Sequence, residues 1–172
     1  MAVRSIIRFP NPLLRAVADP VELFDIDLYR LAGDLVDTMY AAPGIGITAP
    51  HIGVLKRLVA IQLPSAAKSG IYINPSIVEA SPEMIRHTEG SVSMPGVTEE
   101  VERHASVRIR YQDLDGNEHF EDADGLLAVC HQHEIDQLDG IFWTQKLSRL
   151  KRDRLTKRYD KLMRASGADV RR

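Results

Sequence analysis

The sequence predicts an α+β protein containing antiparallel sheet. Apolar residues recur at helical spacing near both ends of the chain and again after residue 124, whereas the middle carries β-branched runs and period-two alternation. Asp115 and Gly116 form an Asp-Gly pair between two of the strand-like runs, which is typical of a two-residue antiparallel hairpin. Helices and strands are segregated along the sequence, and this arrangement favours the α+β class.

The first helix is expected from Asp27 to Tyr40, after a start punctuated by prolines. Asp25 or Asp27 can cap it, because a side-chain carboxylate there accepts hydrogen bonds from the first free backbone amides. The apolar positions that define its buried stripe are Leu28, Leu31, Leu35, Val36 and Met39.

Strands are expected in the middle of the chain, at Arg57–Leu63, Ile71–Ile77 and Val107–Asp113. The first two are rich in apolar and β-branched residues, and the third (VRIRYQD) alternates apolar and polar residues. The DLDG turn then leads into NEHFEDA, which we expect to pair with the third strand.

Two further helices are expected in the last third of the chain. One runs from about Asp124 to Leu138, with Gly140 just beyond its end as a stop signal. The other spans roughly Ser148 to Ala165 and carries a narrow apolar stripe among many basic residues, as in a helix solvated on most of its surface.

The composition indicates one domain over residues 1–172, with 148–172 as a basic helix and tail. No repeat or Gly/Ser-rich linker divides the chain. Lys146–Arg172 holds eleven Lys and Arg against three Asp, which leaves eleven basic against 21 acidic residues in Met1–Gln145. The basic segment can be a solvated face, or it can dock on RNA or an acidic partner.

Cys130 is the only cysteine, so no disulfide can form within the chain. The N-terminal residues lack the apolar run of a signal peptide or membrane span, so we expect a cytoplasmic protein with no membrane partner. A CxxH pattern links Cys130 to His133, but successive helix positions point about 100° apart, so a buried structural cysteine is the favoured interpretation.

Three segments carry a family resemblance: GIGITAPH at Gly44–His51, EGSVSMPG at Glu89–Gly96 and QHEIDQLDG at Gln132–Gly140. Their order and spacing resemble the signature motifs of peptide deformylases, and the resemblance extends over about Val3–Ser148. It implies a deformylase fold, with antiparallel sheets around a central HExxH-type helix and a helix at each end. It also implies removal of the formyl group from the initiator methionine of nascent chains, with a divalent Fe, Ni or Zn ion held by one cysteine and two histidines.

The chain departs from that family at two of the three metal-ligand positions. His133 matches the first histidine, but Gln137 stands where the second should be, and Ser91 stands in place of the cysteine. A neutral hydroxyl and a neutral amide cannot replace a thiolate and an imidazole for a transition metal. We therefore expect the metal to be bound weakly or not at all.

The remaining site residues are also implied by the resemblance. Glu134 matches the general base, Gly46 and the backbone amide of Val92 match groups around the substrate carbonyl, and His51 stands where the family has a glutamine. His51 is either a relocated metal ligand beside His133 or a polar side chain that fills the space of the lost glutamine.

Several functions stay open at this point. The favoured one is a deformylase-like protein with little or no deformylase activity, whose cleft binds a peptide N-terminus or another small ligand. An active metallohydrolase could instead use a site rebuilt from His133, Glu134 and His51 or Gln137, and Ser91 with His133 and Glu134 has the residue types of a metal-free triad. A ribosome- or RNA-binding module is the third option, because a basic C-terminal helix contacts the ribosome in some deformylases.

Overall fold

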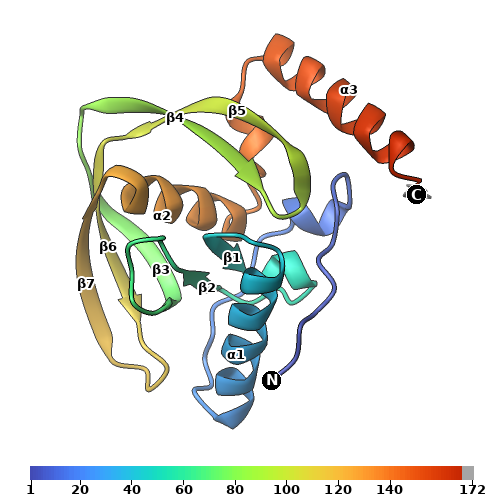
Figure 1. Ribbon diagram of the computed structural model, residues 1–172. Coiled ribbons are helices and arrows are strands. Elements are labelled where there is room, and N and C mark those ends of the chain that lie inside the picture. The colour runs from blue at the N-terminus through green and yellow to red at the C-terminus, as the bar shows by residue number, and fades with distance from the viewer. Residues whose placement is uncertain (168–172) are drawn as a thin grey trace.

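The computed structural model describes residues 1–167 and contains three α-helices and two antiparallel sheets (Figure 1). The helices are α1 (Ile26–Ala41), α2 (Gly125–Leu138) and α3 (Arg149–Ala165). All three were predicted to within about one residue at each end. Short 3-10 turns at Pro12–Arg15, Ala49–Ile52 and Trp143–Lys146 join the larger elements.

The larger sheet has five strands in the order β1-β2-β3-β6-β7, and every neighbouring pair is antiparallel. The predicted hairpin joins β6 to β7, but its turn is longer than the two residues expected. The amide of Asp113 donates to the carbonyl of Asn117, so Leu114, Asp115 and Gly116 form the loop, and of these only Gly116 has a positive φ, of 84°. The strands are β1 (Gly46–Thr48), β2 (Leu58–Ile61), β3 (Gly70–Ala80), β6 (Ser106–Gln112) and β7 (Glu118–Asp124).

A separate two-stranded ribbon is formed by β4 (Met84–Ser91) and β5 (Met94–His104). These strands were not predicted, because the residues of β4 that face the interior are polar. His87 and Glu89 share one side of the strand, and although the pairing with β5 shifts between Glu89 and Ser91, all three residues line a cleft.

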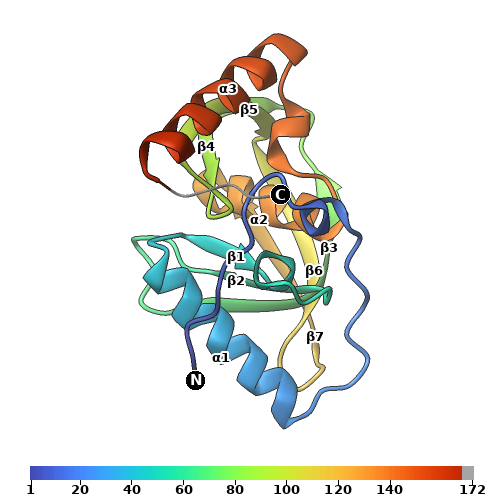
Figure 2. The same cartoon turned by 90° about the vertical axis from the view of Figure 1, so that its right-hand side faces the viewer.

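Helix α2 lies between the large sheet and the ribbon (Figures 1 and 2). It packs against β1, β3, β6 and β7 on one side and against β5 on the other. Nine of its fourteen residues are buried, so side chains all round this helix are held inside the molecule. The expected arrangement of antiparallel sheets around a central helix is therefore confirmed.

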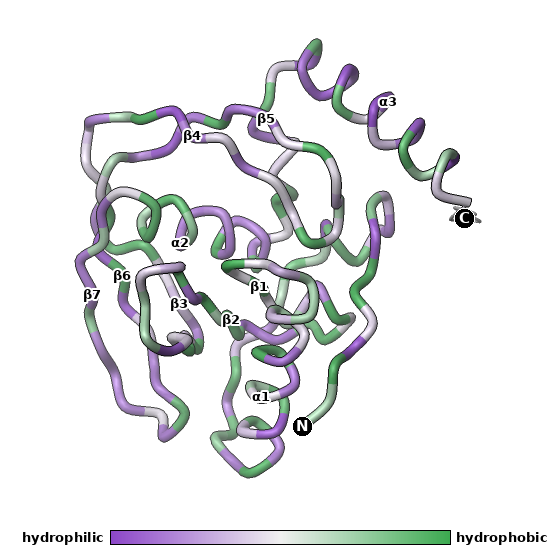
Figure 3. Tube along the Cα trace, in the orientation of Figure 1, coloured by the Kyte–Doolittle hydropathy of each residue, from purple (hydrophilic) through white to green (hydrophobic). Residues whose placement is uncertain are grey.

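The other two helices cover outer faces. Helix α1 packs on β1 and β2, and its start is capped by Asp25, whose carboxylate accepts hydrogen bonds from the amides of Asp27 and Leu28. Helix α3 packs on β5 through Leu155 and Tyr159, which are its buried residues, and the rest of its surface is largely hydrophilic (Figure 3). The expected basic tail at 168–172 lies outside the described residues.

No helix within residues 1–167 has the length and apolar character needed to cross a membrane.

Candidate functional site

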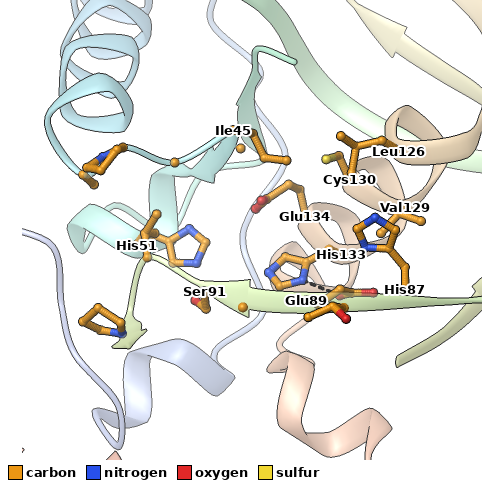
Figure 4. A pocket seen from close by; sticks show the side chains of 18 of the residues that line it. Ile45, His51, His87, Glu89, Ser91, Leu126, Val129, Cys130, His133 and Glu134 are labelled. Carbon is orange, nitrogen blue, oxygen red and sulfur yellow. Dashed lines mark hydrogen bonds and ion pairs between the residues drawn. The ribbon is translucent and has the colours of Figure 1, made fainter. Parts of the chain in front are cut away.

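The three sequence motifs meet in one cleft of about 430 Å³. Strand β1 and the turn after it form one wall, the end of the β4–β5 ribbon forms a second, and α2 forms a third (Figure 4). Segments nearly ninety residues apart in the chain thus contribute to a single site. The predicted site residues that line it are Gly46, His51, Ser91, Val92, His133 and Glu134.

His133 is oriented by a carboxylate on the ribbon. Its Nδ1 lies 2.8 Å from Oε1 of Glu89, and because that carboxylate can only accept, the ring donates from Nδ1 (Figure 4). The partner of His133 is therefore Glu89 and not Glu134, so the structure contradicts the triad of Ser91, His133 and Glu134. Burial acts to lower the pKa of His133, but the hydrogen bond to Glu89 and the charge of Glu134 outweigh it and raise the pKa.

Glu89 belongs to a buried ionic network that joins the ribbon to α2. Arg103 on β5 donates to both oxygens of Glu89 at 2.8 Å, and it also donates to Asp136 of α2 at 2.5 Å. Burial acts to raise the pKa of Glu89, but hydrogen bonds from Arg103 and His133 outweigh it and lower the pKa to about 2. Glu89 is thus a carboxylate at any ordinary pH.

Glu134 has the opposite environment. It is buried, and its Oε2 has no hydrogen-bond partner among the described residues. Burial, with the nearby charge of Glu89, raises its pKa to about 7. Gly46 on β1 permits this close packing, because a Cβ there would lie 2.6 Å from Oε1 of Glu134.

Ser91 ends β4, and Val92 and Ser93 form the tight turn at the tip of the ribbon. The Ser91 hydroxyl accepts a hydrogen bond from the amide of Ser93 at 3.1 Å, and Arg8 donates to the carbonyl of Val92. The position expected for a thiolate is therefore occupied by a small neutral group that already has a backbone partner.

Gln137 is buried on α2 and serves the N-terminal segment. Its amide donates to the carbonyl of Leu14 at 2.7 Å, which fastens the first 3-10 turn against the helix. The side chain at this expected ligand position therefore has a packing partner of its own.

His51 is buried in the turn that follows β1. Its Nδ1 lies 2.9 Å from two groups of Thr48, the backbone amide, which donates to it, and the side-chain hydroxyl, whereas its Nε2 has no hydrogen-bond partner within residues 1–167. Burial, together with the charge of His133, lowers the pKa of the ring to about 3. The ring is neutral, and it faces the cleft shared with Ser91, His133 and Glu134 (Figure 4).

The donors around His133 do not fit a transition-metal site. Within residues 1–167, no group of three or more His, Cys, Asp and Glu side chains is arranged to hold a metal ion. A tight site of this kind needs anionic sulfur or several imidazole nitrogens, whereas Ser91 and Gln137 are neutral and hydrogen-bonded to backbone.

Cys130 also lines the cleft but is not a candidate ligand. The residue is buried, as expected, and burial followed by the charge of Glu134 raises its thiol pKa to about 12. A thiol with such a pKa stays protonated and unreactive at neutral pH.

The site contains two partners that sequence reasoning did not identify. Glu89 was recognised only as the start of a motif, and Arg103 was not singled out. Arg103 lies in TEEVERH, where nothing local distinguishes a buried arginine from a solvated one. For Glu89, the one available signal in the sequence was its place before Gly90, in a motif where a strand leads into a turn.

Comparison with known proteins decides the family. The family model described as polypeptide deformylase matches residues 3–153. The chain belongs to the peptide deformylase family. A peptide deformylase-like protein of Brucella melitensis is 69% identical over 164 residues, which cover 95% of this chain and 100% of the relative. A peptide deformylase of Afipia carboxidovorans is 46% identical over 166 residues, covering 94% of this chain and 96% of the relative.

The deformylase fold is also shown by solved structures. A crystal structure of a peptide deformylase from Legionella pneumophila superimposes with a TM-score of 0.92 at 38% identity, covering 96% of this chain and 98% of that one. The expected deformylase fold is confirmed.

Proposed function

We propose that this deformylase-family protein binds a peptide N-terminus, or a small ligand resembling one, in the cleft around His133 and has little or no deformylase activity. The observation that carries the proposal is that the side chains at the two altered ligand positions already have backbone partners. Ser91 and Gln137 are hydrogen-bonded to the backbone of Ser93 and Leu14, while the cleft itself stays open at about 430 Å³.

Glu134 supports a retained binding role for the cleft. A buried carboxyl with an unpaired oxygen costs stability, so a cleft without any ligand would gain by losing it. The same residue would serve as general base if the chain were an active hydrolase with a rebuilt site, which is the alternative to be tested.

The test is elemental analysis of protein purified anaerobically without chelator, together with a formyl-Met peptide assay on the same sample. We expect less than about a tenth of an equivalent of Fe, Ni or Zn per chain, no turnover, and saturable peptide binding, because the donors left are neutral. Near-stoichiometric metal with turnover would establish the rebuilt hydrolase instead.

A restored variant provides the positive control. Ser91→Cys, Gln137→His and His51→Gln together supply the family's ligands and its amide, so metal and turnover should both appear if the rest of the site is intact. If this variant binds no metal and shows no turnover, the cleft differs from the family at positions outside the three motifs.

A second candidate function is docking of α3 on a ribosome or another RNA. Helix α3 holds eight Lys and Arg against two Asp, and the ion pairs found within residues 1–167 use only Arg149 and Lys151 of these. Arg15, Arg152 and Lys157 line a hollow of about 340 Å³ together with Asp153, so three basic groups and one carboxylate face it and the excess positive charge suits phosphate.

This candidate is tested by binding of full-length protein to ribosomes and to a generic RNA at about 50 and 200 mM salt. Arg152→Glu with Lys157→Glu should abolish binding, whereas Lys68→Glu, an exposed charge reversal outside α3, should weaken it little. Absence of RNA binding by the wild type at low salt would exclude the candidate.

A further inference from the structure

One end of the cleft is apolar and contains a histidine that belongs to none of the three motifs. Leu126 and Val129 of α2 form its wall, and Ile45 extends toward them from the segment before β1 (Figure 4). The side chain of His87 enters the same end from β4. A ligand that fills this end would therefore meet aliphatic side chains and the edge of an imidazole.

The spacing along β4 and α2 explains why His87 lies at this end. Glu89 hydrogen-bonds to His133 at 2.8 Å, which fixes the point where the strand meets the helix. His87 precedes Glu89 by two residues, or about 6.6 Å along a strand. Val129 precedes His133 by four residues, or about 6 Å along a helix. The side chains of His87 and Val129 are therefore expected to lie next to each other, as they do in Figure 4.

The ring of His87 has a nitrogen without a partner. Its Nδ1 is buried and makes no hydrogen bond among residues 1–167. Buried polar atoms normally have a partner, because leaving one unpaired costs stability. The residue as a whole is half-buried and the χ2 torsion of histidine is roughly two-fold, so the ring can turn to bring Nδ1 against a bound ligand.

The surroundings of His87 select a neutral polar group as that partner. A charged group would lose its hydration against Leu126 and Val129, which costs far more than burying a neutral amide. A carboxylate would in addition be repelled by Glu89, which is ionised and lies on the same side of β4. A carboxamide is neutral and carries both a donor and an acceptor, so it can pair with Nδ1 in either tautomer of the ring.

We propose that His87 makes the apolar end of the cleft selective for a ligand side chain with an aliphatic stem and a neutral hydrogen-bonding tip, as in glutamine. The inference rests on the proposed function and specifies the first side chain of the bound peptide. A side chain that is apolar throughout, such as that of norleucine, would fill the same space but would exclude water from Nδ1 without replacing it.

Calorimetry with the full-length protein measures the preference. Three N-formylated tripeptides differ only in their first side chain, which is glutamine, norleucine or glutamate. The wild type should bind the glutamine peptide about fivefold more tightly than the norleucine peptide, the value of one net hydrogen bond, and should bind the glutamate peptide most weakly. If the norleucine or the glutamate peptide binds as tightly as the glutamine peptide, the inference is wrong but the proposed function stands. If no peptide binds, both are wrong.

Variants assign the preference to His87. His87→Leu removes the nitrogen and should reverse the preference, so that norleucine is favoured about tenfold, because the amide tip is then buried without a partner. His87→Asn keeps a polar group near the position of Nδ1 and should retain the preference for glutamine. His119→Leu removes a histidine outside the cleft and should change nothing. A folded His87→Leu protein that still prefers glutamine would overturn the inference.

The contact itself is measured in the wild type by ¹⁵N nuclear magnetic resonance of the imidazole nitrogens. The His87 signals are assigned by their loss in His87→Asn. Saturation with the glutamine peptide should shift the Nδ1 signal, and saturation with the norleucine peptide should shift it much less. A signal that does not respond to the bound glutamine peptide would place its side chain elsewhere and overturn the inference.

Discussion

Two glutamates beside His133 are buried to a similar depth but lie in opposite surroundings. Glu89 receives hydrogen bonds from Arg103 on both oxygens and from His133, and its pKa is lowered to about 2. Glu134 has an oxygen without a hydrogen-bond partner among residues 1–167, and burial raises its pKa to about 7. Depth of burial alone therefore does not decide whether a carboxyl is ionised. The number of hydrogen-bond donors around it decides.

The difference separates two tasks within one cleft. The side with Glu89 and Arg103 holds the ribbon to α2, so it is part of the framework. The side with Glu134 and His51 has buried polar atoms without a partner in the described part of the chain, and both residues line the cleft. Replacing each glutamate by glutamine should therefore have opposite effects on stability at neutral to alkaline pH.

The largest effect is expected for Glu89→Gln. The change leaves the guanidinium of Arg103 buried without its main counter-charge, and breaking a buried pair costs about 3–5 kcal/mol. Denaturant unfolding at pH 7 measures it, with Glu99→Gln as control, since the partly exposed pair with Lys151 should contribute at most about 1 kcal/mol. A loss below about 1 kcal/mol in Glu89→Gln would mean that the network is not what holds the ribbon.

Glu134→Gln should stabilise the protein at alkaline pH. The folded-state pKa of Glu134 is raised from 4.5 to about 7, so the folded chain binds more protons than the unfolded chain between these values and stability falls as pH rises. Removing the group should add about 3 kcal/mol at pH 8 and nothing near pH 4. Unfolding curves at both pH values test this, and a gain that is independent of pH would contradict the assigned cause.

The contribution of Glu89 has the opposite dependence on pH. Its pKa is lowered below the ordinary 4.5, so its stabilisation is complete above that value and is lost as pH falls toward 2. Glu89→Gln should therefore be most damaging at neutral pH and least damaging in acid.

A smaller effect is expected for Gly46→Ala. The added Cβ would meet Oε1 of Glu134 at 2.6 Å, and overpacking of this kind costs about 1–3 kcal/mol. The cost should largely vanish in a Glu134→Ala background, which a double-mutant cycle measures. An equal cost in both backgrounds would place the strain elsewhere on β1.

The smallest effect concerns the Cys130 thiol. Its raised pKa is caused mainly by burial and only secondarily by Glu134, so Glu134→Gln should speed alkylation at pH 8 by less than about threefold. A much faster reaction would mean that this variant opens the cleft.

Helical periodicity and the Asp-Gly pair were enough to predict all three helices and the β6–β7 hairpin. The ribbon was missed because His87, Glu89 and Ser91, which face inward from β4, are polar, so period-two hydrophobicity is absent where the strand lines the cleft. A strand whose inward-facing residues line a polar cleft is therefore difficult to predict from alternating hydrophobicity.

The candidate site shows a similar division. The residues that line the cleft could be located from motif spacing, but their hydrogen-bond partners could not. Glu89 for His133, the carbonyl of Leu14 for Gln137 and the amide of Thr48 for His51 depend on tertiary geometry or on ring orientation. These partners decide which atoms are free for a ligand.

The network around Arg103 has a consequence for how this chain could diverge. Arg103 joins Glu89 of the ribbon to Asp136 of the central helix through ion pairs within the chain. In small metalloproteins whose fold depends on an ion, loss of a ligand is also loss of the fold. Here the cross-link is encoded in the polypeptide, so substitutions at ligand positions can accumulate without removing the fold on which natural selection acts.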